Sequence, residues 1–322
     1  MRTSRLSLAL LLFGALSLGA AACGDDDDSG GGGGGAKDLS GKIAIDGSST
    51  VLPFAQAAAE LFNEDNPEVK ITVGSSGTGG GFEKFCAGET DISDASRPIK
   101  PDEEVPVCEK NKVAYQEIQV ANDGIAIVTN KSLTIDCMTV DQLKQLWGKG
   151  SKVKSYDEID PKLPKTPAQL FGPGTDSGTF DFFTDQINGE EGQSRSDYEP
   201  SEDDNVIVEG VSGSPGGLGY LGFSYYEQAT DKLNLVGVGE SEANCVKPNA
   251  QTIQDGSYKP LSRPSFRYPS EKALALPEVK AFMDFVLANQ ADIAKEAQIV
   301  GMTPEQATKG EAALKEAETK AG

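Results

Sequence analysis

Three short stretches of the chain place serine and threonine hydroxyls beside glycine, each between a strand-like apolar run and a helix-like amphipathic run. They are "DGSSTVLPF" at 46–54, "GSSGTGGGF" at 74–82 and "GTDSGTFDFF" at 174–183. Each would present hydroxyls and unpaired backbone N–H groups at a helix N-terminus, where the helix dipole is positive. Such an arrangement can bind an anion.

Helix capping is the ordinary explanation for any one of these loops, because Ser, Thr and Asp are preferred N-cap residues. Three such loops in one chain favour a ligand site. Strand-to-helix loops of an α/β sheet lie along one sheet edge, where proteins of this class bind their ligands.

Arg97, in "DASRPI" at 94–99, adds a cation to this set. It could form a surface ion pair with Asp91 or Asp94. Its position between Ser96 and Pro98 favours a different role, because a short rigid turn would aim the planar guanidinium in a fixed direction. That geometry suits bidentate contact with a tetrahedral oxyanion.

The elements that must position these residues alternate along the chain. Short apolar runs typical of strands alternate with amphipathic runs typical of helices, at 42–47, 51–67, 69–74, 80–89 and 124–130. The region 125–260 repeats the theme, with a polar stretch at 190–205 that we expect to be solvated surface. A return strand at 261–270, a helix at 277–297 and a helical tail from Thr303 follow. This order predicts an α/β sheet with helices on its faces.

The N-terminus has the pattern of an export signal. Arg2 and Arg5 precede an apolar run at 6–18, and "GAAAC" follows. The run is shorter than the ~20 residues that cross a bilayer. A cysteine after three alanines predicts a signal peptide at 1–22 and a lipoprotein with Cys23 as its lipidated first residue, the alternative being an ordinary signal. Residues 23–40, rich in Asp and Gly, predict a flexible linker.

Composition excludes several classes of chemistry. The chain of 322 residues has 0 histidines, which removes Ser-His-Asp and Cys-His catalysis and histidine metal sites. An enzyme would have to act through carboxylates, lysine or tyrosine alone, and we expect no enzyme, no cofactor and no metal. The formal net charge of −21 argues against nucleic acid as a partner. It still allows an anionic ligand, because exposed charges are screened beyond ~8 Å at physiological salt.

Four cysteines remain beyond Cys23, an even number that suits disulfides in an exported protein. Three pairings are possible. We favour Cys86–Cys108 with Cys137–Cys245, because each pair then stays within one inferred domain. Metal binding is the weaker reading, since no C-x-x-C pair occurs.

Five stretches together carry a family resemblance. They are "DGSSTVLP", "GSSGTGGGF", "DISDASRPI", "TDSGTFDFF" and "LSRPSF", in this order behind a lipoprotein signal. Between about residues 42 and 300 the chain resembles the phosphate-binding proteins of bacterial phosphate ABC transporters, the PstS family of the periplasmic binding protein superfamily. No chemistry is performed on the ligand in such proteins.

The resemblance implies an α/β, two-lobed type II periplasmic-binding-protein fold, in which each lobe is a sheet flanked by helices and the ligand cleft lies at the hinge. Lobe 1 would comprise residues 41–122 and 263–322, and lobe 2 residues 123–262. It also implies a monomer that captures inorganic phosphate and delivers it to permease subunits. The protein would be held at the outer face of the cell membrane by its lipid alone.

The resemblance also implies the ligand contacts. In the first loop it assigns Ser49, Thr50 and Val51, and in the second Ser75 or Ser76. In the turn after the next strand it assigns Ser96 and Arg97, and in the third loop Ser177, Gly178 and Thr179. In the best-known members an aspartate stands where this chain has Ser96, and an arginine where it has Pro173. Arg97 would then supply the missing cation from the opposite lobe.

Selectivity would depend on a carboxylate. Monohydrogen phosphate keeps a proton that a buried carboxylate can accept, whereas sulfate offers only acceptors. A mismatch of this kind costs about 3 to 5 kcal/mol. Asp176 is the first candidate and Asp46 the second, although Asp176 could instead be an N-cap that points away. The alternatives are a receptor of the same fold for sulfate or molybdate, and an exported phosphatase.

Overall fold

The structure, a computed structural model, describes residues 39–175 and 177–321. The predicted signal peptide, Cys23 and Asp176 lie outside the described residues, as does the predicted linker up to residue 38. Ten strands are formed in the described part: β1 Gly41–Gly47, β2 Val69–Val73, β3 Ile92–Ala95, β4 Ile118–Asn130, β5 Cys137–Thr139, β6 Gln169–Pro173, β7 Glu199–Ser201, β8 Gly217–Gly222, β9 Leu233–Gly239 and β10 Ser262–Pro269.

The α-helices of the same described ranges are α1 Leu52–Asp65, α2 Gly77–Cys86, α3 Val105–Lys110, α4 Val140–Trp147, α5 Gly178–Phe183, α6 Asp204–Gly213, α7 Phe223–Gln228, α8 Ala250–Gln254, α9 Glu271–Leu274, α10 Pro277–Ala288, α11 Gln290–Glu296 and α12 Pro304–Ala321. Short 3-10 turns lie at Tyr156–Glu158 and Glu242–Asn244, and a π-helical turn at Thr184–Asn188 continues α5.

The strands form one mixed sheet in the order β2-β1-β3-β10-β4-β8-β6-β7, with β9 pairing both β4 and β5. Parallel pairing joins β1 to β2 and to β3. Antiparallel pairing joins β10 to both β3 and β4, and joins β4 to β8 and β9. The strand-to-helix loops after β1 and β3 therefore meet at one edge, as parallel neighbours require.

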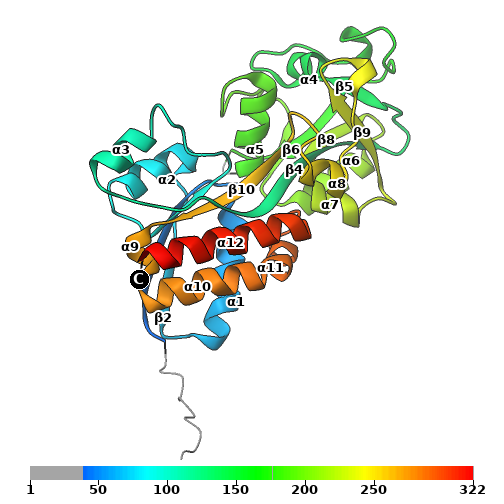
Figure 1. Cartoon of the computed structure of the whole chain (residues 1–322). Helices are drawn as coiled ribbons and strands as arrows, with labels where there is room; N and C mark the ends of the chain where they lie inside the picture. The colour runs from blue at the N-terminus through cyan, green and yellow to red at the C-terminus, as the bar shows by residue number, and fades with distance from the viewer. Residues whose placement is uncertain (1–38, 176, 322) are drawn as a thin grey trace, which may run out of the picture. The chain divides into compact units, whose positions relative to one another are not determined.

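The described residues form three apolar clusters on this sheet: two large ones, called here the first and second cores, and a smaller one between α2, α3, β3 and β10. The first core is built by α1, α10, α11 and α12 against β1 and the start of β4, with Phe54, Phe62 and Phe282 among its buried side chains. The second core surrounds Trp147 and Tyr220 and is formed by β4, β6, β8 and β9 with their helices. Figure 1 shows the helices of the first core below β10 and those of the second core around β8 and β9.

Strand β4 passes from one core to the other. Its residues 118–121 belong to the first core and residues 125–128 to the second. The passage, at Asn122, Asp123 and Gly124, is where β4 pairs with the first residues of β10. This strand was predicted only for 124–130. Its first half escaped prediction because polar residues interrupt the apolar run there.

The helix predicted at 277–297 is divided in two. Its apolar stripe is buried as expected, with Val279, Phe282 and Met283 in the first core. Asn289, however, has φ −113° and ψ 15°, which is not helical, and it separates α10 from α11. The amide of Asn289 donates to the Phe285 carbonyl oxygen and so satisfies an acceptor at the end of α10.

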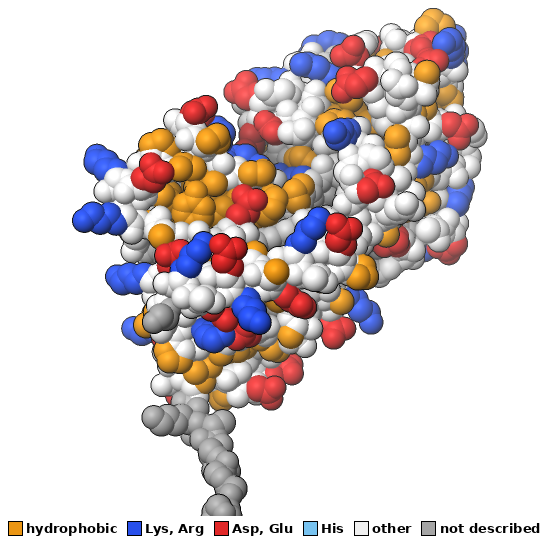
Figure 2. Space-filling view, viewed as in Figure 1, with side chains coloured by type: hydrophobic (Ala, Val, Ile, Leu, Met, Phe, Trp, Pro, Cys, Tyr) orange, Lys and Arg blue, Asp and Glu red, His pale blue; other side chains and the backbone are white. Residues whose placement is uncertain are grey.

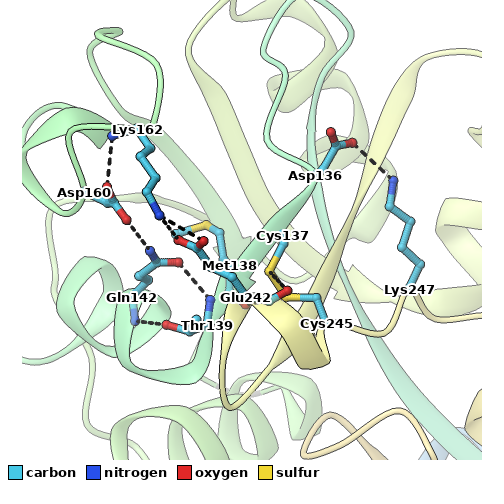
Figure 3. The surroundings of a disulfide bond; sticks show 10 residues. All are labelled: Asp136, Cys137, Met138, Thr139, Gln142, Asp160, Lys162, Glu242, Cys245 and Lys247. Atoms are coloured by element: carbon cyan, nitrogen blue, oxygen red, sulfur yellow. Dashed lines mark hydrogen bonds and ion pairs between the residues drawn. A yellow bond between two sulfur atoms is a disulfide. The ribbon is translucent and has the colours of Figure 1, made fainter.

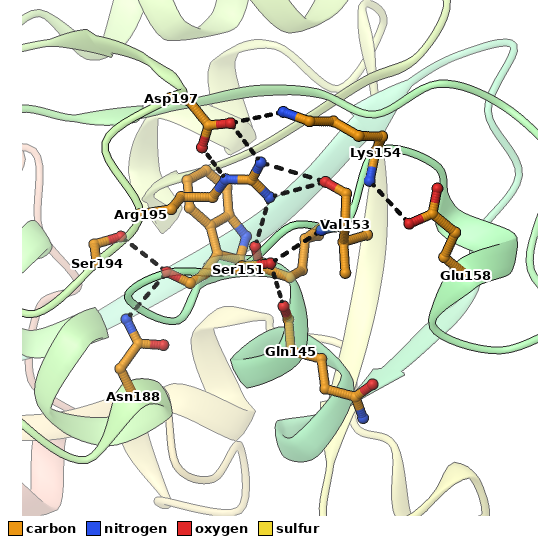
Figure 4. A network of polar contacts seen from close by, with 11 residues as sticks. Gln145, Ser151, Val153, Lys154, Glu158, Asn188, Ser194, Arg195 and Asp197 are labelled. Atoms are coloured by element: carbon orange, nitrogen blue, oxygen red, sulfur yellow. Dashed lines mark hydrogen bonds and ion pairs between the residues drawn. The ribbon is translucent and has the colours of Figure 1, made fainter.

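The polar stretch at 190–205 corrects a prediction, because part of it is buried structure. Arg195 is only 5% exposed. Its guanidinium donates to the carbonyl oxygens of Leu146 and Val153 and forms two hydrogen bonds with Asp197 (Figure 4). The burial of Arg195 was missed because the backbone oxygens that accept from it lie more than forty residues away, which no local pattern reveals.

The structure contains two disulfides, Cys86–Cys108 and Cys137–Cys245. The first joins the end of α2 to α3. The second joins the start of β5 to the segment after β9, beside the ion pair of Lys162 with Glu242 (Figure 3). Within residues 39–175 and 177–321 we find no helix that could cross a bilayer and no cluster of carboxylates and cysteines that could hold a metal ion.

Candidate functional site

A cavity of about 680 Å³ lies where the two cores face each other, and we call it the main cavity. One wall comes from the loop after β1, the start of α2 and the turn after β3; the other comes from α5, the π-helical turn and Glu191. Arg263, at the start of β10, lines the cavity as well. The space-filling view is hollowed between the α2 and α5 sides of the molecule (Figure 2).

The first loop connects β1 to α1. Ser48 and Thr50 are buried, and the Thr50 N–H donates to the Ser48 hydroxyl at 3.3 Å. Ser48, Ser49 and Thr50 line the main cavity. Val51 is fully buried, and the N–H that the resemblance assigns to the ligand donates to the Ser48 carbonyl oxygen at 3.1 Å. The hydroxyls of this loop, rather than Val51, face the cavity.

The second loop ends at Ser76, the residue before α2. Gly77 follows with φ +76°, a left-handed conformation that glycine adopts without strain. The main cavity is lined by Ser76 and by Gly77, Thr78, Gly79 and Gly80 of the first turn of α2. Without side chains at three of these positions, an anion could approach the N–H groups at the positive end of the helix dipole. Ser75 is exposed and does not line this cavity.

Asp46 is held by α2. The Ser76 hydroxyl donates to its Oδ1, and Lys84 Nζ donates to its Oδ2 at 2.7 Å. Burial alone would raise the pKa of Asp46, but the hydrogen bonds from Lys84 and Ser76 hold it below its usual value. Both carboxylate oxygens thus have partners within the first half of the molecule, which argues against Asp46 as the acceptor of a ligand proton.

The third loop leads into α5 and packs directly on the first. The Thr50 hydroxyl donates to the Gly178 carbonyl oxygen at 3.2 Å. A Cβ atom at Gly178 would lie 2.4 Å from the backbone nitrogen of Thr50, so this close approach requires glycine. Ser177 caps α5 by accepting from the Thr179 N–H.

Ser177, Gly178 and Thr179 line a second cavity of about 280 Å³, which they share with Ser49 and Thr50. This second cavity also reaches Asp123 and Asp204. The structure therefore brings five predicted residues together at the main cavity, Ser49, Thr50, Ser76, Ser96 and Arg97, and places the third-loop residues next to it. Ser49 and Thr50 belong to both cavities.

Arg263 belongs to the motif "LSRPSF", but no role for it followed from the sequence. It is a cation of the main cavity: Nη1 donates to the Ser96 hydroxyl at 2.9 Å and Nη2 to the Thr50 hydroxyl. It thus connects the first loop with the turn after β3. A signal existed in the sequence, because the tripeptide Ser-Arg-Pro occurs at both 96–98 and 262–264.

The charge of Arg263 is incompletely compensated. Its Nε lies 3.5 Å from Oδ2 of Asp123, the residue opposite it on β4, and neither atom has a hydrogen bond within the described part of the chain. The guanidinium carbon stands 3.6 Å from the ring centroid of Phe182. Burial lowers the pKa of Arg263 to about 10 although Asp123 opposes the change. The group is therefore protonated at neutral pH, in a place where a bound anion would complete its coordination.

Arg97 is paired with Glu104, not with Asp91 or Asp94. Its Nη1 and Nη2 donate to the two carboxylate oxygens of Glu104 at 2.9 and 2.7 Å. The side chain is 33% exposed, compared with 15% for Arg263. Arg97 lines the main cavity while holding this pair.

The wall on the α5 side carries carboxylates. Asp181, Asp185 and Glu191 line the main cavity, and Asp181 Oδ2 accepts from the Ser49 hydroxyl at 3.3 Å. Burial raises the pKa of Asp181 although Ser49 and Arg263 oppose the change. The main cavity thus combines a hydroxyl-rich, cationic wall with an acidic one. Such a site can bind an oxyanion that still carries a proton.

Comparison with known proteins agrees with this geometry. The PBP superfamily domain matches residues 33–290. The chain is 42% identical to "Protein SphX" of Synechococcus elongatus, over 81% of this chain and 77% of that one. It is 38% identical to the "Phosphate-binding protein PstS" of Staphylococcus saprophyticus, over 94% and 93% of the two chains.

A solved structure is similar throughout. The crystal structure of a "possible phosphate binding protein" from Planctomyces limnophilus has a TM-score of 0.81 and 42% identity, and the match covers 87% of this chain and 99% of that one. Its two-lobed α/β fold is the fold of this chain.

Proposed function

Because the chain belongs to the PstS family of phosphate-binding proteins, we propose that it captures inorganic phosphate in the main cavity and delivers it to the permease of an ABC transporter. Relatives that are themselves phosphate-binding proteins, such as the PstS protein of Staphylococcus saprophyticus, support phosphate as the ligand. The cavity supports it independently, since its cationic wall consists of hydroxyls, arginines and the N-terminal turn of α2.

Arg263 carries the proposal. It is a mostly buried arginine that is hydrogen-bonded to hydroxyls from two of the predicted ligand segments, Thr50 and Ser96, and only loosely paired with Asp123. Guanidinium groups bind phosphate oxygens bidentately, with charge-assisted hydrogen bonds roughly twice as strong as neutral ones. Phosphate at this position would lie beside the hydroxyls of both segments.

Asp181 is our candidate acceptor for the phosphate proton, next to Asp176, which the sequence favours. Asp181 lines the main cavity and lies on the wall opposite Ser76 and Arg97. An ionised carboxylate there would accept the proton of monohydrogen phosphate and repel sulfate, which has no proton to donate.

Closure around the ligand is the motion that we propose. Lobe 1 would comprise residues 41–122 and 263–322 and lobe 2 residues 123–262, with the hinge where β4 and β10 cross between the cores. A ligand that touches both walls would stabilise the closed form. The receptor would perform no chemistry on phosphate, would act as a monomer, and would be attached to the membrane by a lipid on Cys23.

Isothermal titration calorimetry of the purified mature protein with phosphate, sulfate and molybdate tests the proposal. We expect phosphate to bind and the other two to bind at least about a hundredfold more weakly, as a mismatch of about 3 kcal/mol implies. Equal affinities for phosphate and sulfate would instead identify a general oxyanion receptor. Turnover of a phosphomonoester would identify a phosphatase.

A further inference from the structure

Arg97 has one free edge. Its Nη1 and Nη2 donate to Glu104, and Nη1 also donates to the Pro98 carbonyl oxygen. Nε forms no hydrogen bond with any described residue. The remaining edge, formed by Nε and Nη2, is a second two-donor fork of the same planar group. Because Arg97 lines the main cavity, this edge is the one available to a ligand.

Glu104 is fixed from several sides. Its Oε2 also accepts from the Lys100 N–H at 2.8 Å, so both carboxylate oxygens have partners. The side chain is 14% exposed. Hydrogen bonds from Arg97 and the Lys100 N–H hold the pKa of Glu104 below its usual value even though burial alone would raise it. Glu104 is therefore ionised at neutral pH and stays in one orientation.

The backbone of Glu104 is held by the Cys86–Cys108 disulfide. Glu104 is the N-cap of α3, and the Cys108 N–H donates to its carbonyl oxygen at 3.1 Å. Cys86 Sγ lies 3.7 Å from that same oxygen. The Asn111 amide adds a bond to the Cys86 carbonyl oxygen at 2.8 Å. Helix α3, only six residues long, is thus attached to α2, beside which it lies in Figure 1.

We propose that Glu104, held in place by the Cys86–Cys108 disulfide, is a positioning residue that aims the free edge of Arg97 into the main cavity, so that phosphate affinity depends on this disulfide. The proposal rests on the proposed function. It adds a determinant of affinity that touches no ligand and that responds to thiol reduction.

The physical reason is orientation. A free arginine side chain has large rotamer entropy, part of which is lost each time it is ordered around a ligand. Glu104 orders the guanidinium before the ligand arrives. The same pair leaves Arg97 charged and fully able to donate from Nε, so the positioning does not consume the edge that phosphate would use.

The first test compares phosphate affinity of Glu104→Gln in two backgrounds by calorimetry. In the otherwise native chain we expect roughly tenfold weaker binding, the scale of one charge-assisted pair. In the Arg97→Ala background we expect Glu104→Gln to change nothing, because its target is gone. Weakening of equal size in both backgrounds would overturn the proposal, and so would tighter binding in the native background.

The second test removes the disulfides one at a time. Cys86→Ser with Cys108→Ser should weaken phosphate binding about three- to tenfold. Cys137→Ser with Cys245→Ser is the matched control, because that disulfide lies in the second core, at β5, and neither cysteine lines the main cavity. We expect unchanged affinity in the control. Equal loss in both pairs would mean a general effect on stability and would overturn the proposal.

Mild reduction of the native protein covers the case in which the Cys86 and Cys108 variant does not fold. Reduced protein should bind phosphate more weakly, and reduced protein that already carries Glu104→Gln should lose nothing further. Full affinity after complete reduction would contradict the role of the disulfide. A native protein that binds no phosphate at all would refute the proposed function, and a native binder in which Glu104→Gln is silent would refute only this inference.

Discussion

The tripeptide Ser-Arg-Pro occurs twice at the main cavity, and its two arginines are held in opposite ways. Arg97, after β3, has its carboxylate partner in bidentate contact and a third of its side chain exposed. Arg263, at the start of β10, is only 15% exposed, stacks on Phe182 and lies 3.5 Å from its carboxylate partner.

The difference shows that burial and pairing, not local sequence, decide what each arginine can do. For a well-paired, partly exposed arginine, the free-energy cost of staying charged is small, and its contribution to ligand affinity is small until a ligand orders it. A mostly buried arginine with an incomplete ion pair is destabilised by desolvation, and an anion bound in the cavity can offset this cost. We therefore expect Arg263 to dominate the affinity and Arg97 to adjust it.

The largest effect is expected from Arg263→Ala. Removing a buried, hydrogen-bonded cation costs about 3 to 5 kcal/mol, so phosphate binding should weaken at least about a hundredfold in calorimetry. Arg263→Lys keeps the charge but loses the paired donors to Thr50 and Ser96. Its phosphate affinity should lie between those of the native chain and Arg263→Ala. A native dissociation constant for Arg263→Ala would reverse the ranking of the two arginines.

Arg97→Ala should have a smaller effect, about 10- to 30-fold, because its charge is already neutralised by Glu104 and partly solvated. The loss should shrink as salt is raised, since this arginine is the more exposed of the two. Affinity measured at low and high salt checks this. A loss as large as that of Arg263→Ala would show that both arginines are ligand cations of equal weight.

Gly178→Ala tests the contact that places α5 beside Thr50 and hence beside Arg263. A Cβ atom there would meet the Thr50 nitrogen at 2.4 Å, so the third loop must shift and phosphate binding should weaken about tenfold. Gly213→Ala is the control, because its Cβ would meet no atom within 4 Å. If both variants bind like the native chain, the close approach has no role in affinity.

The smallest expected effect concerns how the stability of the fold depends on pH through Asp204 and through Glu104. Burial raises the pKa of Asp204, which shares the second cavity with Asp123, to about 6. A raised carboxyl pKa stabilises the fold at low pH, and this contribution is lost as pH rises through 6. Between pH 5 and 7 the native chain should lose about 1 kcal/mol of stability relative to Asp204→Asn.

Denaturant unfolding of both chains at pH 5, 6 and 7 measures this difference. The pKa of Glu104 is lowered, so its contribution is lost only when pH falls through a value below the usual one, outside this window. The difference between the native chain and Asp204→Asn from pH 5 to 7 should therefore report the titration of Asp204, because both chains carry every other titrating group. Unfolding curves that stay parallel over this range would mean that Asp204 titrates normally.

The parts of the site that the sequence predicted are those built by local pattern. Ser49, Thr50 and Ser76 follow strands and precede helices, so their place at one sheet edge could be read from the order of elements. Arg97 was proposed because the turn between Ser96 and Pro98 would aim its side chain, and Ser96 because the family resemblance implies it.

The parts that the sequence could not predict depend on long-range pairing. Arg263 reaches the cavity only because β10 pairs antiparallel with both β3 and β4, which no local pattern fixes. Glu104 was missed as the partner of Arg97 because a turn at 100–104 brings it back, whereas the nearer aspartates were considered instead. Asp46 was considered as an acceptor because Lys84, one helix away, could not be placed beside it.

The path of β4 has a consequence for folding. Both cores are built on this one strand, whose residues 118–121 belong to one and 125–128 to the other. If one core unfolds, the end of β4 that belongs to the other core is exposed. The two cores should therefore unfold together in one cooperative transition. If the two halves bend toward each other as proposed, they should thus still unfold as a single unit.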